Sequence, residues 1–312
     1  MQAAPAYATV YFSDEEMEFE TEESPEDEFT NTLNSMEGCS LATAGGWVEI
    51  DAYLGGGAFG GVFAARFSGL SVAAKVLPYV TSQEKGEFDR EAKVLERLKE
   101  CNHPNIIAFI GNVVPLDFPT IGVLMFERVC YGSVQDHIDT AGATVPVELA
   151  WKLYDQIIDG LAYLHAMGIY HRDIKPANLL VTSITDLSLK ITDFGLAYVD
   201  KGECPILQEP CGTDGYLPPE AFDLGEYCAE DGDLWAAAIV LVYVATLESP
   251  WDAAKEGDEF FKGFLEGETY QEYWTQIGES RFQMFDLLNP SREERIQPPK
   301  YQALVRNYRN VP

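Results

Sequence analysis

Residues 171–180, HRDIKPANLL, place five polar side chains within eight positions before the chain turns apolar. The Asp173 carboxylate can orient an attacking hydroxyl group and accept its proton, and the Lys175 ammonium can stabilise charge on a transferred group. Asn178, and Asp193 in the following ITDFGLA, carry oxygen ligands of the kind that magnesium prefers. Each residue taken singly also fits a polar loop with satisfied hydrogen bonds. The rest of the sequence must therefore decide between such a loop and a catalytic site.

A glycine-rich stretch lies earlier in the chain, with Gly55, Gly57 and Gly60 followed by Val62. Glycines have no Cβ atom, so the backbone can approach a phosphate group closely. Dinucleotide-binding folds use a similar spacing, but there the turn leads from a strand into a helix, with an acidic residue about 20 positions further on. Here the turn joins two strand-like runs. This argues against a dinucleotide site and leaves phosphate binding and an ordinary turn as alternatives.

Lys75 ends the apolar run LSVAAK, and Glu91 lies in a helix that we predict over residues 84–100. A lysine at the end of an apolar strand often extends its ammonium group to solvent. However, the apolar residues of the predicted helix recur at spacings of three and four, and Glu91 falls on the same face. A buried carboxylate needs a partner. The two residues together therefore predict an ion pair that holds the ammonium against phosphate oxygens.

The elements that must position these residues change character along the chain. Short strand-like runs and glycine turns dominate from Trp47 to residue 126, around one predicted helix. From about residue 133 the chain is largely helical, and the pattern over residues 147–167 is amphipathic. The apolar run Leu234–Leu247 is too short to cross a bilayer and predicts a buried helix. This order predicts an α+β protein with two unlike lobes.

Charge is the most unusual feature of the composition, with 21 Lys and Arg against 51 Asp and Glu and a formal net charge of −30. Residues 1–46 contain no lysine or arginine and few aliphatic side chains. Such a segment buries too little surface to offset its ordering entropy, so we expect an acidic, disordered leader. Phosphates are repelled by an acidic surface, which argues against nucleic acid and membrane partners and favours basic proteins.

The cysteines form no C-x-x-C pair and no zinc-type spacing: Cys39, Cys101, Cys130, Cys204, Cys211 and Cys228. In a chain of this length we expect reduced thiols in a cytoplasmic or nuclear, intracellular protein. The N-terminus lacks the basic and apolar regions of a secretory signal peptide, which agrees with that expectation.

Taken in order, the glycine loop, VAAK, the helix glutamate, H-R-D-x-K-x-x-N and D-F-G resemble the eukaryotic protein kinase family over roughly residues 48–300. The resemblance implies a two-lobed fold, with an antiparallel sheet and one helix in the N-lobe and a mainly helical C-lobe. It also implies ATP and Mg²⁺ as cofactors. The implied boundaries are a catalytic domain over 47–305, divided into N-lobe 47–126, hinge 127–131 and C-lobe 132–305, and a tail over 306–312.

The same resemblance assigns roles to individual residues. The implied catalytic residues are Asp173 and Lys175, and the implied metal ligands are Asn178 and Asp193. The implied ATP-binding set comprises Leu54, Gly55, Gly57, Gly60, Val62, Ala73, Lys75, Glu91, Glu127 and Val129, the last two in the hinge. Further implied features are a gatekeeper at Phe126, a pair between Glu220 of LPPE and Arg295, and an aspartate, Asp233, that holds the backbone of the catalytic loop.

Two residues favour the serine/threonine branch of the family. Lys175 follows Asp173 by two positions, and Thr213 stands where a threonine contacts both of them in that branch. The stretch SPWDAAKEGDEFF is similar to checkpoint-type members of the calmodulin-dependent kinase group. We therefore expect transfer of the γ-phosphoryl group of ATP to accessible Ser or Thr hydroxyls of proteins. Ser133 and Ala177 stand where members directed to basic substrates usually carry acids, which counts against an arginine-directed preference.

The segment from Asp193 to Pro210 contains no serine or threonine, so the usual phosphorylation site of the activation loop is missing from the sequence. Glu209 stands near that site. We predict that its carboxylate pairs with Arg172 and orders the loop in part, because a carboxylate carries less charge than a phosphate. Activation-loop phosphorylation is then not needed. An ordinary exposed Glu209 is the alternative.

Two other functions remain open at this point. A pseudokinase scaffold would have the same fold without transfer, although the residues that such proteins commonly lose, Lys75, Asp173 and Asp193, are all retained. A small-molecule kinase of related fold is the second alternative. Arg172 and Glu220 count against it, because such kinases tend to carry H-G-D and to lack the segment that shapes a peptide groove.

Overall fold

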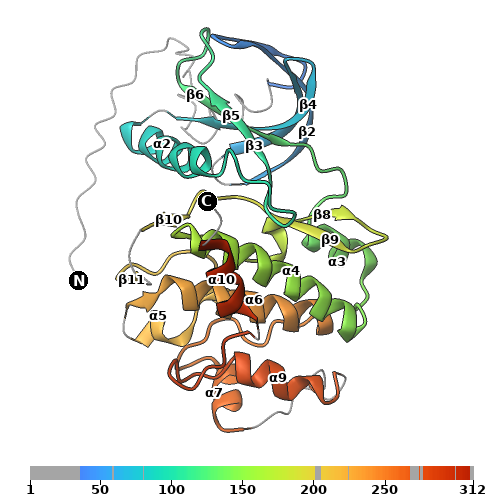
Figure 1. Ribbon diagram of the computed structural model, residues 1–312, viewed down its shortest axis with the longest axis vertical. Coiled ribbons are helices and arrows are strands. Elements are labelled where there is room, and N and C mark those ends of the chain that lie inside the picture. Colours follow the sequence, from blue (N-terminus) through green and yellow to red (C-terminus); the bar gives the residue numbers. More distant parts are fainter. Residues whose placement is uncertain are drawn as a thin grey trace, which may run out of the picture.

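The computed structural model describes residues 36–57, 60–79, 81–200, 205–223, 225–267, 274, 277–298 and 300–309. They form two unlike lobes, one above the other in Figure 1. The upper lobe combines one sheet with helix α2, and the lower lobe is mainly helical. The predicted two-lobed α+β fold is confirmed.

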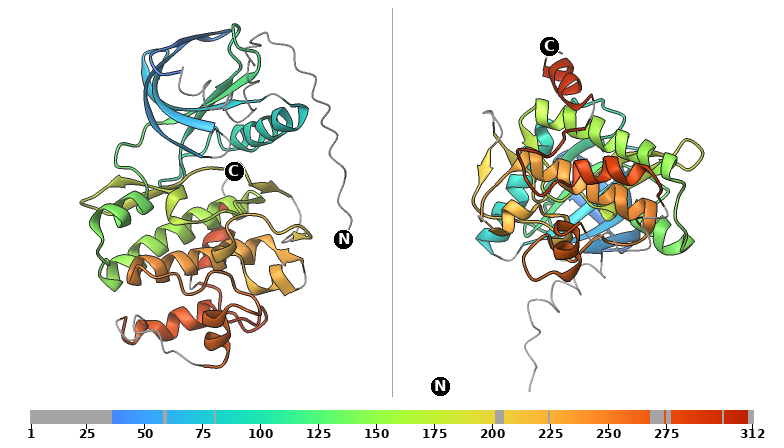
Figure 2. Two further views of the ribbon diagram at one scale, coloured as in Figure 1. Left: turned by 180° about the vertical axis from the view of Figure 1, so that it is seen from behind. Right: turned by 90° about the horizontal axis from the view of Figure 1, so that it is seen from below.

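The N-lobe sheet has six antiparallel strands in the order β1-β2-β3-β4-β6-β5. Their bounds are β1 (Ser40–Thr43), β2 (Gly46–Gly57), β3 (Gly60–Phe67), β4 (Leu70–Pro78), β5 (Phe109–Val113) and β6 (Ile121–Glu127). Helix α2 (Ser82–Arg97) lies on the side of the sheet toward the C-lobe (Figure 2). It begins in a capping box, because the Thr81 side chain accepts from the Glu84 N–H and the Glu84 carboxylate accepts from the Thr81 N–H.

The C-lobe is built around α6 (Ala229–Thr246), which is buried along nearly its whole length. Its sequence is apolar on all sides, as expected for a helix that other elements surround. The other helices that the structure describes in this lobe are α3 (Val134–Ala141), α4 (Val147–Ala166), α5 (Pro219–Asp223), α7 (Glu259–Leu265), α9 (Ser280–Leu287), α10 (Tyr301–Arg309) and the short 3-10 helices η1 (Pro176–Asn178) and η2 (Asp214–Tyr216). The helices predicted from residues 147–167 and 234–247 are confirmed as α4 and α6.

Among the described residues of the C-lobe, three two-stranded sheets connect the helices and carry the loops. They pair β8 (Leu179–Ser183) with β9 (Ser188–Ile191), β7 (Ile169–Tyr170) with β10 (Tyr198–Val199), and β11 (Ile206–Leu207) with β12 (Tyr227–Cys228). The first pair directly precedes the D-F-G segment, and the third joins the activation segment to the start of α6. None of the helices described here combines the length and the apolar character that a bilayer crossing requires.

The predicted disordered leader is wrong in its last part, because residues 36–46 belong to the N-lobe. Strand β1 pairs with β2 across a tight turn, where the Thr43 hydroxyl donates to the Gly46 carbonyl at 2.7 Å. On the other side, the Ala42 carbonyl accepts from the Leu116 N–H, which follows β5, at 2.7 Å. Leu41 and Met36 are buried in the core of the sheet. Residues 1–35 lie outside the described part of the chain.

We predict that Leu41→Ala destabilises the N-lobe by about 2–3 kcal/mol, because Leu41 is fully buried and its removal leaves a cavity. The free energy of unfolding, followed by urea titration, measures this. Ser40→Ala is the control on the same strand; its side chain is exposed, so we expect a change below about 0.5 kcal/mol. Equal effects of the two substitutions would contradict a structural role for β1.

Two further predictions need correction. The C-lobe does not end at residue 305, because α10 continues to Arg309 and packs on α4. An amphipathic helix of nine residues is short, and its tertiary contacts rather than its sequence fix where it ends.

The prediction that all cysteines are reduced is wrong for Cys228, which is disulfide-bonded, whereas Cys39, Cys101, Cys130 and Cys211 are free. Sequence spacing does not report cysteines that the fold brings together.

Candidate active site

Lys75, Glu91 and Asp193 meet where the two lobes face each other. They come from β4, α2 and the loop after β9. The Lys75 Nζ atom lies 2.8 and 3.0 Å from the two carboxylate oxygens of Glu91 and 2.9 Å from Asp193 Oδ1. The predicted Lys75–Glu91 ion pair is therefore present, and Asp193 joins it from the other lobe.

Burial and charge oppose each other in this triad. Burial alone would lower the pKa of the Lys75 ammonium, but the charges of Glu91 and Asp193 outweigh it and raise the pKa. Burial likewise acts to raise the pKa of Asp193, but its pKa is lowered because Lys75 outweighs that effect. For Glu91 burial prevails, so its pKa is raised despite Lys75. The lysine is therefore charged, and Asp193 is ionised at neutral pH.

The catalytic-loop residues are held by a small network of hydrogen bonds. Thr213 Oγ1 donates to Asp173 Oδ1 at 3.0 Å, and Lys175 Nζ donates to Thr213 Oγ1 at 3.0 Å and lies 2.8 Å from Asp173 Oδ2. The contact of Thr213 with both residues, predicted for the serine/threonine branch, is present. Asn178 Nδ2 donates to Asp173 Oδ2 at 2.9 Å. These contacts fix the orientation of the Asp173 carboxylate.

The donor set of Asn178 and Asp193 suits a magnesium ion. The Asn178 amide directs its NH₂ group to Asp173, so its carbonyl oxygen is available to a cation. The Thr192 N–H donates to the main-chain carbonyl of Asn178 at 3.0 Å, which brings the neighbouring Asp193 close to Asn178 and does not engage the side-chain oxygen. One ionised carboxylate and one amide oxygen match the preference of magnesium for oxygen ligands.

The catalytic loop backbone is anchored on α6 by Asp233. Its carboxylate accepts from the His171 N–H at 2.8 Å and from the Arg172 N–H at 2.7 Å. Burial acts to raise the pKa of Asp233, but hydrogen bonding and charge, first from His165, lower it, so the group stays ionised. Arg172 has a φ of 69°, in the left-handed region that costs a non-glycine residue about 1–2 kcal/mol. The predicted role of Asp233 in holding the loop matches this geometry.

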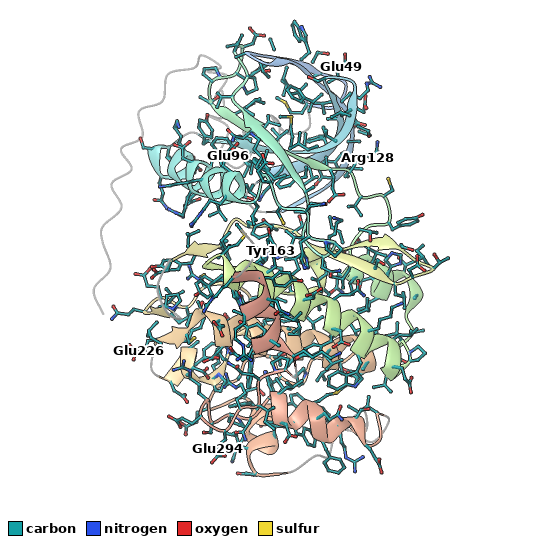
Figure 3. The ribbon with its side chains drawn as sticks, viewed as in Figure 1. Glu49, Glu96, Arg128, Tyr163, Glu226 and Glu294 are labelled. Carbon is teal, nitrogen blue, oxygen red and sulfur yellow. The ribbon has the colours of Figure 1, made fainter. Side chains whose placement is uncertain are left out.

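The predicted nucleotide-pocket residues lie on adjacent strands and in the hinge. Gly55 pairs with Val62 and Gly57 with Gly60 across β2 and β3. A Cβ atom at Gly60 would lie 2.4 Å from the Val76 carbonyl oxygen, so only glycine fits there. Leu54 lies on β2 and is exposed, and Ala73 lies on β4 opposite the buried Phe126. Glu127 and Val129 stand on either side of Arg128, which is labelled in Figure 3, in the segment predicted as the hinge.

Glu127 is fixed by two contacts that the sequence did not suggest. Its carboxylate accepts from the Ala108 N–H at 2.7 Å and lies 2.8 Å from Lys190 Nζ. Lys190 precedes the D-F-G segment on β9 and also donates to the Ile106 carbonyl at 3.1 Å. The sequence signal for this contact was the position of Lys190 on a strand between two apolar residues, Leu189 and Ile191, both of which are buried. Glu127, at the start of the segment predicted as the hinge, is thus tied to the loop after α2 and to β9, which ends two residues before Asp193.

The Glu220–Arg295 pair is present. Two parallel hydrogen bonds of 2.9 Å join the guanidinium to the carboxylate, and the guanidinium lies 4.5 Å from the centre of the Trp235 ring. The Glu220 side chain is only 11 % exposed and that of Arg295 only 6 %. This pair fixes the segment that follows the activation loop to the lower part of the C-lobe.

The predicted Glu209–Arg172 ion pair is wrong. Arg172 Nη2 donates to the backbone carbonyl of Glu209 at 3.1 Å, and Arg172 Nε donates to the Tyr227 hydroxyl at 3.3 Å. Within the described residues, no contact joins the two side chains, and that of Glu209 is exposed. The reason is that the β11–β12 pairing brings Tyr227 and the Glu209 main chain to the guanidinium.

Comparison with known proteins agrees with this geometry. The family model described as "Protein kinase domain" matches residues 48–302. The "Serine/threonine-protein kinase chk-1" of Caenorhabditis briggsae is 34 % identical over 217 residues, covering 68 % of this chain and 43 % of the relative. The "Calcium/calmodulin-dependent protein kinase type 1B" of Rattus norvegicus is 33 % identical over 238 residues, covering 74 % and 66 %. The chain thus spans less than half the length of the first of these relatives.

Proposed function

Since this chain belongs to the protein kinase family, and its relatives are serine/threonine kinases, we propose that it transfers the γ-phosphoryl group of ATP to Ser or Thr hydroxyls of proteins. The observation that carries the proposal is the contact of one lysine, Lys75, with Glu91 from the upper lobe and Asp193 from the lower. Phosphoryl transfer depends mainly on positioning and charge neutralisation, and these three charged groups supply both.

Each residue of the site has a distinct part in the proposed reaction. The Asp173 carboxylate orients the substrate hydroxyl and accepts its proton, while Lys175 stabilises negative charge on the transferred group. The Lys75 ammonium, held by Glu91, faces the α- and β-phosphates. Asn178 and Asp193 hold magnesium, which when bound neutralises the phosphate oxygens.

The nucleotide is proposed to lie under the glycine loop and against the hinge. Gly55, Gly57 and Gly60 let the β2–β3 backbone approach the phosphates. Side chains of Leu54, Val62 and Ala73 provide an apolar surface for adenine, and the backbone of Glu127 and Val129 offers it hydrogen bonds. The carboxylate of Glu127 is already engaged by Ala108 and Lys190, which favours a fixed hinge.

Activation-loop phosphorylation is not required in this proposal. In the absence of a phosphate, Arg172 hydrogen-bonds the Tyr227 hydroxyl and the Glu209 carbonyl, and the β11–β12 ladder holds the same segment. Burial acts to lower the pKa of Arg172, but hydrogen bonding and charge, Tyr227 first, raise it. The guanidinium therefore stays charged with neutral partners.

We expect Tyr227→Phe to reduce turnover about 3–10-fold, because the half-buried Arg172 guanidinium loses a hydrogen bond worth about 1–2 kcal/mol. Glu209→Ala is the matched control and leaves turnover unchanged, because it keeps the backbone carbonyl. Initial rates on a peptide substrate, with phosphorylation states checked by mass spectrometry, measure both. A drop with Glu209→Ala, or activity that disappears after phosphatase treatment, would contradict phosphorylation-independent ordering.

The proposed partners are protein substrates with accessible Ser or Thr, basic ones in particular, and neither nucleic acid nor membranes. The net charge of −30 supports this, since opposite charges attract a basic chain and repel phosphates. A cytoplasmic or nuclear location is part of the same proposal; the free Cys39, Cys101, Cys130 and Cys211 support it, whereas the disulfide at Cys228 counts against it.

A degenerate peptide array tests the proposal. The purified 312-residue chain is incubated with ATP and magnesium, and phosphate incorporation is read on Ser, Thr and Tyr arrays with varied flanking residues. We expect incorporation on Ser or Thr that stops when magnesium is chelated. Incorporation on Tyr alone, or none on any array while MgATP binds, would favour another kinase class or the pseudokinase alternative.

A further inference from the structure

Helix α10 buries a tyrosine hydroxyl deep in the C-lobe. The Tyr301 hydroxyl lies 2.6 Å from Nδ1 of His165 on α4, and both side chains are excluded from solvent. Burial, together with the nearby Glu230 carboxylate at the start of α6, raises the pKa of this hydroxyl, so the hydroxyl keeps its proton. A phenylalanine would fill this space equally well, so packing alone does not account for the hydroxyl.

The contacts continue from His165 to the catalytic loop. His165 Nε2 lies 2.8 Å from Asp233 Oδ2, and because the ionised carboxylate can only accept, the imidazole N–H donates. Asp233 in turn accepts the His171 and Arg172 N–H groups. An unbroken series of hydrogen bonds therefore joins α10 to the backbone next to Asp173.

We propose that α10 positions the catalytic loop through the Tyr301 hydroxyl. Tyr301 fixes the His165 ring, His165 orients the Asp233 carboxylate, and Asp233 holds the loop backbone so that Asp173 points toward the substrate hydroxyl. Tyr301 is thus a positioning residue, 128 positions after Asp173 in the sequence. The effect on turnover rests on the proposed phosphoryl transfer, whereas the effect on the loop backbone does not.

The conformation of the loop explains why such support matters. Arg172 has a φ of 69°, and Asp193, which follows the carbonyl that accepts from His171 Nε2, has a φ of 65°. Strained residues of this kind keep their conformation only where the surroundings hold them. A less firmly oriented Asp233 would let the backbone at Arg172 relax and turn Asp173 away from its place.

A second tyrosine on the same helix provides a matched control. The Tyr308 hydroxyl donates to Asp159 Oδ1 at 2.6 Å and lies 2.9 Å from Nε2 of His103, in the loop after α2. Its ring packs against Tyr163, labelled in Figure 3. Tyr308→Phe therefore removes a hydrogen-bonded, half-buried hydroxyl from α10 without touching the Asp233 contacts.

The experiment compares Tyr301→Phe and Tyr308→Phe in the full chain, at a temperature at which both remain folded by thermal melting. For Tyr301→Phe we expect kcat for a peptide to fall roughly tenfold with the KM for ATP nearly unchanged, since a buried hydrogen bond is lost. Hydrogen exchange at the His171 and Arg172 amides should become roughly tenfold faster. Tyr308→Phe should change neither quantity.

Three results decide the matter. Equal losses in the two variants would mean that any weakening of α10 docking matters, and would overturn the proposal. Unchanged exchange at His171 and Arg172 in Tyr301→Phe would also overturn it. If the unmodified chain transfers no phosphate, the proposed function fails, but the exchange measurement still tests the link from Tyr301 to the loop.

Discussion

Asp173→Asn is expected to lower turnover roughly 10³-fold while the KM for ATP changes little. A positioned base contributes about 10²–10⁴-fold to such reactions, and an amide cannot accept the proton of the substrate hydroxyl. The substitution also replaces one carboxylate oxygen with an NH₂ group, which must then face Thr213 or the donors Lys175 and Asn178. Initial rates at saturating ATP, together with MgATP binding by thermal shift, measure the two quantities.

The control for this substitution is Asp139→Asn on α3. Asp139 is exposed and accepts a hydrogen bond from Gln135, so its replacement should leave turnover unchanged. Residual activity within about tenfold of the unmodified chain in Asp173→Asn would show that Asp173 is not the base. Loss of MgATP binding in the same variant would mean that the site itself had been disturbed.

Arg295→Met should destabilise the C-lobe by about 3–5 kcal/mol, because it leaves the buried Glu220 carboxylate without its partner. The guanidinium now forms two hydrogen bonds to Glu220, donates to the Asn289 carbonyl at 3.0 Å and covers the Trp235 ring. Chemical unfolding followed by tryptophan fluorescence reports the loss, since Trp235 lies against the substituted side chain.

A second arginine nearby shows how much of the expected loss of stability is due to burial and how much to charge alone. Arg292 pairs with Asp231 but its side chain is 47 % exposed, so Arg292→Met should cost below about 1 kcal/mol. The double variant Glu220→Gln with Arg295→Met should recover part of the stability, because it removes the unpaired buried charge. Equal costs for the two arginines would show that the Glu220–Arg295 pair is not special.

Sequence reasoning succeeded where a local pattern carried a physical demand. An acid on the apolar face of a helix needs a cation, and Lys75 was the candidate within reach of Glu91. The order of strands and helices similarly predicted two unlike lobes, and the apolar run before Leu247 predicted the buried helix α6. In each case the information lay within a short stretch of chain or in the order of a few stretches.

It failed where the partner was a backbone group or a distant side chain. The Arg172 guanidinium donates to a carbonyl and a tyrosine hydroxyl, and a carbonyl has no signature in the sequence. Tyr301 and His165 are separated by 136 positions, so no periodicity connects them. The four-residue strand β1 is formed by its pairing with β2 and by its contact with Leu116, not by its own propensity.

Strand β1 has a consequence for how copies of this chain behave beside one another. An open sheet offers a row of unsatisfied amide groups onto which a neighbouring chain can add a strand, and this is a common route to aggregation. Here the outer side of β1 already accepts from Leu116, so part of the margin of the N-lobe sheet is closed by its own polypeptide. A chain that lost this short hairpin would present β2 as a long bare border and would be more prone to precipitate at high concentration.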